Sequence, residues 1–226
     1  MKWNNNARFF ARAIHIVAAL FFVSSKLQAQ VFDTIRASFH SKPKAYFQID
    51  AYNSFVSSEP ANTFGLRAGL EFNKRVRITL GYYNLTSDIV KPKLITGVFA
   101  NGDTTLNAKL DMSYFTGSFE YIFYNKDPWQ FSVPLNIGAG KSYFWYYKNA
   151  AGDRGRIDEK LVMLTIFSVG AQYKILKWFG VGAGLGYRVM LKDNSNIDEN
   201  FNSVIYSVGL RIFIGEAVNL VLGRGG

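Results

Sequence analysis

The sequence contains no cysteine, only two histidines and only five prolines among its 226 residues. The absence of cysteine excludes disulfide scaffolds, cysteine-ligated zinc or iron–sulfur sites, cysteine nucleophiles and a lipidated N-terminal cysteine. No run of 18 or more apolar residues occurs, so no segment is a candidate for a membrane-spanning helix. The chain is instead rich in Gly (20), Phe (20) and Tyr (13), which favours β structure over a helix bundle or a disordered chain.

The first 29 residues have the layout of a secretory signal peptide. A basic region with Lys2, Arg8 and Arg12 precedes an apolar run, Ala13–Val23, and small Ala29 is suited to the position before cleavage. A buried N-terminal helix is the alternative interpretation. Without this segment 22 basic and 16 acidic residues remain, so the formal charge falls from +10 to +6. Export and the lack of any motif argue against nucleic acid as a partner.

From Ala45 onward, apolar and polar residues alternate with a period of two, which is typical of β-strands. The clearest run is 179–189, where every second residue up to position 186 is glycine. The alternation predicts eight strands, at 45–54, 64–72, 76–83, 110–124, 130–139, 160–173, 179–189 and 203–214. The predicted fold is therefore all-β: an eight-stranded antiparallel up-and-down barrel over residues 45–214.

Such strands build either a soluble lipocalin-like barrel, apolar inside, or a transmembrane barrel, apolar outside. Glycines at 180, 182, 184 and 186 suit the crowded inner wall of a narrow barrel better than a solvated outer face. The predicted connections also alternate in length, short after strands two, four and six and longer after the others. Short turns at one end and long loops at the other are typical of outer-membrane barrels. Both features favour the transmembrane barrel.

Aromatic residues gather near the two ends of the predicted strands, as expected of rings at the two lipid–water interfaces. One group flanks the short turns (Phe72, Tyr124, Trp129, Tyr173, Trp178, Phe179), and the other lies toward the long loops (Tyr82, Tyr83, 143–147, Tyr187, Phe201). Together with the signal peptide, this pattern predicts an integral protein of the cell outer membrane. We expect both chain termini in the periplasm, with an arm at 30–44 and a C-terminal tail at 215–226.

The terminal strand carries a family resemblance. Gly209, Ile212 and Ile214 stand in a spacing that resembles the signal by which barrel-insertion machinery recognises outer-membrane strands. With the run 64–70 and the overall size, the chain resembles the small PorT-like barrels of Bacteroidota and, more loosely, OmpX and the OmpA membrane domain. The likeness covers residues 45–214, whereas the chain continues for twelve residues beyond the signal strand. The PorT-like resemblance implies an accessory role in protein secretion or outer-membrane assembly.

The strand parity places a set of charged residues inside the barrel. Glu71 and Arg77 are symmetric about Lys74, so a hairpin through that turn sets them opposite each other, within reach of Glu120. Because unpaired buried charges are costly, we expect a structural network of ion pairs; a narrow solute or proton path is the alternative. The predicted interior charge network comprises Asp50, Arg67, Glu71, Arg77, Glu120, Arg188 and Arg211, with Gln48 beside it.

Catalysis is not expected. The only histidine outside the signal segment is His40, which precedes the first strand, so the barrel lacks the base that known barrel hydrolases use. Asp193–Glu199 offers oxygen ligands for calcium but lacks the EF-hand glycine and spacing, so a polar loop is the favoured interpretation. We expect no catalytic site, no metal and no cofactor.

The connection after the third strand predicts a projecting hairpin. Asn101 and Gly102 suit a tight turn in which both residues have positive φ, with 94–100 and 103–106 as its arms. Its edge could pair with a strand of another protein, or the hairpin could cap the barrel mouth. Basic residues near this rim (Lys91, Lys93, Lys109, Lys148, Arg154, Arg156, Lys192) could contact lipopolysaccharide phosphates.

The predicted function is therefore that of a monomeric outer-membrane barrel with a structural or surface-interaction role. Its expected partners are outer-membrane lipid and lipopolysaccharide, the insertion machinery, and a protein at the extracellular loops or the periplasmic arm. A secretion or assembly accessory and a small-solute channel are the alternatives.

Overall fold

The computed structural model describes residues 30–56, 59–96, 102–148, 152–197 and 201–214. The predicted signal peptide and C-terminal tail lie outside these residues. Residues 30–38 form a short helix, and nine strands follow within the described part of the chain. They are β1 (Lys44–Val56), β2 (Glu59–Phe72), β3 (Val76–Leu85), β4 (Val90–Ile95), β5 (Thr104–Lys126), β6 (Trp129–Tyr147), β7 (Arg154–Leu176), β8 (Phe179–Lys192) and β9 (Ser203–Ile212). None of the described helices is long and apolar enough to cross a membrane.

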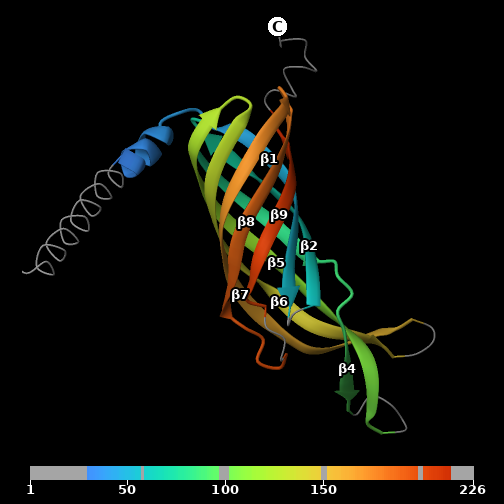
Figure 1. The fold of residues 1–226 in the computed structure, drawn as a ribbon. Helices are drawn as coiled ribbons and strands as arrows, with labels where there is room; N and C mark the ends of the chain where they lie inside the picture. Colours follow the sequence, from blue (N-terminus) through green and yellow to red (C-terminus); the bar gives the residue numbers. More distant parts are fainter. Residues whose placement is uncertain (1–29, 57–58, 97–101, 149–151, 198–200, 215–226) are drawn as a thin grey trace, which may run out of the picture.

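Eight of the strands close into a ring in which every neighbouring pair is antiparallel (Figure 1). The order is β1-β2-β3-β5-β6-β7-β8-β9, and β1 closes the ring by pairing with β9 from Phe47↔Ile212 to Asn53↔Tyr206. The predicted eight-stranded up-and-down barrel is confirmed. The remaining strand, β4, is not part of the ring and pairs only with the first part of β5, from Val90↔Lys109 to Ile95↔Thr104. It therefore extends the sheet beyond the ring.

The two ends of the barrel differ. At one end, called the turn end below, lie the short β2–β3, β5–β6 and β7–β8 turns, together with helix 30–38 and the end of β9 (Figure 1). In the β2–β3 turn, Asn73 and Lys74 both have positive φ, which suits a tight hairpin. At the opposite end, called the ribbon end, β4, β5, β6 and β7 project beyond the ring as a four-stranded sheet. A membrane-spanning strand needs only about 9–11 residues, whereas β5 and β7 each have 23.

Two expectations about strand limits are wrong. The first connection is short rather than long, because the β1–β2 ladder continues to Val56↔Glu59 and only residues 57–58 separate the strands. Strand β9 ends at Ile212, so Ile214 of the resembled insertion signal lies beyond it. The end of β9 is instead held by the backbone N–H of Phe213, which donates to the carbonyl of Trp178 at 2.9 Å.

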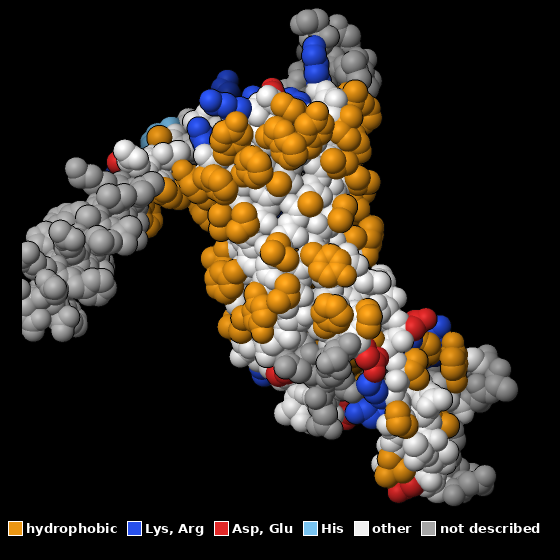
Figure 2. Space-filling view, in the orientation of Figure 1, with side chains coloured by type: hydrophobic (Ala, Val, Ile, Leu, Met, Phe, Trp, Pro, Cys, Tyr) orange, Lys and Arg blue, Asp and Glu red, His pale blue; other side chains and the backbone are white. Residues whose placement is uncertain are grey.

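Neighbouring residues of each strand point to opposite sides of the barrel wall, as the alternation predicts. On the outer wall, apolar side chains from all eight ring strands are exposed to the surroundings. Figure 2 shows them on one side of the barrel. Those more than 40% exposed include Phe55, Phe64, Leu66, Leu70, Ile78, Leu80, Phe115, Val133, Ile137, Phe167, Val169, Leu185, Val208 and Leu210. This set forms an apolar belt around the barrel, and the side chains of opposite parity fill the lumen.

Candidate functional site

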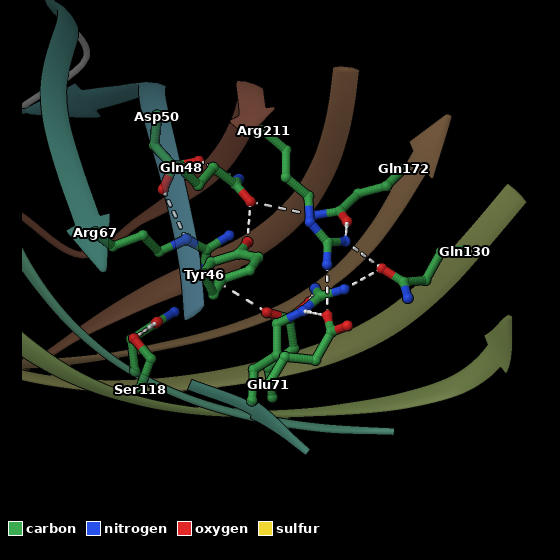
Figure 3. A network of polar contacts seen from close by, with 12 residues as sticks. Tyr46, Gln48, Asp50, Arg67, Glu71, Ser118, Gln130, Gln172 and Arg211 are labelled. Carbon is green, nitrogen blue, oxygen red and sulfur yellow. Dashed lines mark hydrogen bonds and ion pairs between the residues drawn. The ribbon is translucent and has the colours of Figure 1, made fainter. Parts of the chain in front are cut away.

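Six buried charges fill the half of the lumen nearer the turn end (Figure 3). They are three carboxylates and three guanidinium groups, so their formal charges balance: Asp50, Glu71, Glu120, Arg67, Arg77 and Arg211. Each is at most 7% exposed. They come from β1, β2, β3, β5 and β9, which the closed ring brings around one narrow space.

Arg77 lies at the centre of this charge network. Its Nε is 2.6 Å from Oε2 of Glu71 and its Nη1 is 2.6 Å from Oε1 of Glu120. The ladder pairs Glu71 with Arg77 on one side and Arg77 with Glu120 on the other, so the three side chains face inward in one cross-strand row. Arg77 also donates a hydrogen bond to the side-chain oxygen of Gln130. Charge-assisted bonds of this length offset the cost of removing these groups from water.

Two further arginines extend the network through three more ion pairs. Arg211 reaches the same Glu71 oxygen at 2.5 Å and donates to the amide oxygens of Gln130 and Gln172. Arg67 pairs with Asp50 at 3.0 Å and lies 3.8 Å from Glu120.

Tyr46 is not among the residues predicted for the interior network, yet its ring lies against three of these cations. The guanidinium carbons of Arg77 and Arg211 are each 4.8 Å from the ring centroid, and that of Arg67 is 5.8 Å away. The electron-rich ring attracts all three guanidinium groups, which lie close to one another despite their like charge. Tyr46 shares the inward parity of Gln48 and Asp50 on β1, and that parity is the signal that could have found it.

Arg188 lies apart from the other predicted network residues. It is 1% exposed, and its Nε donates to the carbonyl of Phe201 at 2.8 Å while Nη2 donates to the hydroxyl of Ser54 at 3.2 Å. Its position on β8, beyond the glycine stretch, places it on the ribbon side of the lumen. The strand parity predicted that the Arg188 side chain points inward, but not its position along the barrel axis.

Apart from Arg188 and its polar partners, the half of the lumen nearer the ribbon end is filled mainly by apolar side chains. They belong to a buried core cluster that continues from the lumen onto the projecting sheet and is called the apolar plug below: Tyr52, Val56, Ala61, Tyr83, Leu85, Ile89, Ile95, Ala108, Leu110, Met112, Tyr114, Phe144, Tyr146, Leu164, Ile166, Ile197, Phe201 and Ile205. At the boundary toward the charge network the rings of Tyr52, Tyr83 and Tyr114 are stacked, with centroids 5.1 and 5.4 Å apart. The hydroxyl of Tyr83 donates to Asp50 at 3.0 Å, which joins the plug to the charge network.

The expectation that the aromatic residues near the long loops all lie at the outer interface is wrong in part. Tyr82, Tyr147 and Tyr187 do face the surroundings, whereas Tyr83, Phe144 and Phe201 are buried in the plug. Adjacent residues of a strand point to opposite sides, so a run such as 143–147 serves both the lumen and the outer surface. At the turn end, Tyr124, Trp129 and Tyr173 face outward.

The glycines of β8 lie on the inner wall beside the charge network. Gly182 and Gly184 line a small cavity together with Gln48, Arg67 and Glu120. A Cβ at Gly184 would stand 2.6 Å from the hydroxyl of Ser207, so the wall has little room for side chains. A wider cavity of about 800 Å³, including its open mouth, enters the lumen from the turn end and is lined by Lys44, Tyr46, Glu71 and Arg211 among others.

Two loop predictions are only partly covered by the described residues. Gly102 has a φ of +91°, as a tight turn requires, and Asn101 lies outside the described residues. The described arms of that hairpin are β4 and the start of β5, slightly offset from the predicted arms. Pro92 and two lysines stand on the β4 edge, a composition that disfavours pairing with a further strand.

The polar segment after β8 is hydrogen-bonded to β6 and β7 through Asn194. Asn194 is 1% exposed, and its amide nitrogen donates to the carbonyls of Ser142 and Asp158 at 3.1 and 2.6 Å. Within the described parts of the chain no group of three or more His, Asp or Glu could hold a metal ion.

Comparison with known proteins places this geometry in a fold class. No protein-family model matches the sequence, and no curated protein matches it. Among solved structures, the chain is similar to Neisserial surface protein A, with a TM-score of 0.54, 16% identity and coverage of 75% of this chain and 96% of the other. The N-terminal β-barrel domain of Pseudomonas aeruginosa OprF (0.47, 13% identity, 76% and 98%) and Ail of Yersinia pestis (0.46, 14%, 76% and 98%) also match. The chain therefore has the fold of a small outer-membrane β-barrel.

Proposed function

We propose that this chain is an integral outer-membrane barrel without enzymatic chemistry, whose ribbon end contacts molecules at the cell surface. The observation that carries the proposal is the apolar belt, which surrounds a lumen that holds six paired charges. A barrel in water would place these surfaces the other way round, because exposing the belt to water and burying the charges would both be unfavourable. The turn end, helix 30–38 and both chain termini would then lie in the periplasm.

The lumen does not favour a solute channel. The cavity that enters from the turn end meets the charge network, and the apolar plug fills the lumen beyond it. We therefore expect the purified chain to give no steady openings in planar lipid bilayers, and a stable conductance would contradict this part of the proposal.

The absence of native cysteine allows a direct test of membrane placement. Thr105 on the projecting sheet and Lys177 in the β7–β8 turn are both exposed. In intact cells, a maleimide too large to cross the outer membrane should label the variant Thr105→Cys and leave Lys177→Cys unlabelled until the cells are lysed. The cysteine-free parent is the background control. Equal labelling of both variants in intact cells, or recovery of the folded chain in the soluble fraction, would overturn the proposal.

The same two positions separate a surface-contact role from the accessory role that the PorT-like resemblance implies. A photo-crosslinking residue at Thr105 should capture neighbours in intact cells, whereas one at Lys177 should capture few besides the insertion machinery. Reproducible crosslinks from Lys177 to secretion or assembly components, with none from Thr105, would replace the surface-contact role by the accessory one.

A further inference from the structure

The outer surface of the projecting sheet carries a row of aromatic and basic side chains. They are Lys109 on β5, Tyr143, Trp145 and Tyr147 on β6, and Arg154 and Arg156 on β7, called the cation–aromatic face below. The ladder pairs Lys109 with Trp145, Trp145 with Arg156, and Tyr147 with Arg154. Directly opposite residues point to the same side of a sheet, so all six lie on one surface.

The rings hold the two arginines in place. The guanidinium carbon of Arg154 is 4.5 Å from the ring centroid of Trp145 and 5.7 Å from that of Tyr147, and that of Arg156 is 4.7 Å from Tyr143. A ring contact uses the flat face of a guanidinium and leaves its N–H edge free to bind an oxyanion in a bidentate manner. Holding the side chain beforehand also reduces the entropy that binding would cost.

The neighbouring carboxylates are directed mainly at lysines. Glu159 accepts a hydrogen bond from Lys141 at 2.6 Å and is 3.5 Å from Arg156, while Lys109 pairs with Asp88. The bond from Lys141 lowers the pKa of Glu159, so this carboxylate stays ionised and engaged at neutral pH. Asp111 accepts from the Tyr143 hydroxyl at 3.1 Å. Of these three carboxylates none is directed at Arg154, and Arg156 has one long ion pair, the 3.5 Å contact with Glu159. The arginine pair is therefore the part of the face best placed to bind an anion.

The position of the face identifies the side from which a ligand approaches. It continues the outer wall of the barrel beyond Phe115 and Ala139, where the apolar belt ends on β5 and β6. Trp145 is six residues past Ala139, about 20 Å along the strand and less in height because barrel strands are tilted. The β6–β7 hairpin leans away from the barrel axis (Figure 1). In the proposed placement its outer surface therefore faces the surrounding membrane surface.

From this geometry we propose that the cation–aromatic face binds the phosphorylated sugar headgroup of a glycolipid in the outer leaflet. Arg154 and Arg156 receive the phosphate, and the exposed ring of Tyr147 lies against the sugar. The inference rests on the proposed membrane placement, and it deepens that function by naming a partner and the residues that bind it. A soluble anion would be held by this face alone. A glycolipid headgroup is also held by its own lipid chains, which lie against the apolar belt and keep the headgroup beside the face.

The test compares bilayers that differ only in the phosphates. The full chain is placed in phosphatidylcholine nanodiscs containing increasing fractions of diphosphorylated lipid A or of lipid A from which the phosphates have been removed. Because a ligand that binds the folded state stabilises it, the thermal unfolding midpoint should rise with the phosphorylated lipid only. The double variant R154Q/R156Q should lose most of this rise, with apparent affinity weakened about tenfold or more, since two charge-assisted contacts are removed.

The control variant is K148Q/K192Q, which removes two exposed positive charges elsewhere at the ribbon end. It should keep the phosphate-dependent rise, and the single variant R154Q should lose part of it. An unchanged rise in R154Q/R156Q, or an equal loss in the control, would overturn the inference. Failure of the chain to give a folded, heat-modifiable form in any bilayer would instead overturn the proposed membrane function, so the two failures are distinguishable.

Discussion

The two halves of the lumen are filled by opposite kinds of side chain, charged in one half and mainly apolar in the other. Near the turn end, the narrow space is filled by three carboxylates and three guanidinium groups that neutralise one another around Tyr46. Near the ribbon end, it is filled mainly by the apolar plug, in which the largest buried side chains are aromatic or aliphatic. The stacked tyrosines 52, 83 and 114 lie between the two halves.

Because of this difference, the two halves depend on their members in different ways. A paired charge network is balanced as a whole, so the loss of one member leaves its partners buried with too few counter-charges. An apolar cluster has no such partners, and the cost of a truncation is set by the apolar surface lost and the cavity that remains. Variants of the two halves should therefore differ in how strongly a conservative replacement rescues them.

The largest effect is expected for Arg77→Ala. This change removes an ion pair of 2.6 Å from Glu71 and another of 2.6 Å from Glu120, and breaking a buried pair costs about 3–5 kcal/mol. Unfolding by urea in lipid vesicles, followed by the heat-modified gel shift, measures the free energy of unfolding. A loss below about 1 kcal/mol, which is typical of exposed pairs, would show that the network does not bear on stability.

A somewhat smaller effect is expected in the apolar plug. Phe144→Ala removes a fully buried ring and should cost about 3 kcal/mol. The matched control is Phe115→Ala, whose ring is 68% exposed on the outer wall and faces lipid in the proposed placement. Lipid chains replace its contacts, so it should cost less than about 1 kcal/mol. If the control is as costly as Phe144→Ala in vesicles, the plug is not the stabilising element at this end.

The smallest and most discriminating effect is the difference between two variants of one residue. Glu71→Gln keeps an oxygen that can accept from Arg77 and Arg211, whereas Glu71→Ala leaves both donors unsatisfied. We expect Glu71→Ala to be less stable than Glu71→Gln by about 1–2 kcal/mol. Heat-modified gel shifts at the same temperature for both variants would contradict a hydrogen-bonded network at this position.

Much of the wall was predictable from local pattern, and the exceptions have physical reasons. The Glu71–Arg77 pair follows from the symmetry of one hairpin and needs no long-range information. Arg211 joins the same Glu71 oxygen only because the ring closes between β1 and β9, a contact across 140 residues that no local pattern contains. The wrong length of the first connection has a local cause, because the segment 54–63 lacks the strong alternation that marks the other strands.

Alternation along the chain was sufficient to predict the period of the strands, the inward direction of the charged side chains and the eight-stranded ring, because a pleated strand fixes direction residue by residue. The position of each residue along the barrel axis was set by the packing of the strands together: which inward residues meet at one level of the lumen, why Arg188 lies apart from the other arginines, and where the charge network ends and the apolar plug begins. This axial position depends on the stagger of all eight strands around the closed ring, and alternation along a single strand carries no information about it.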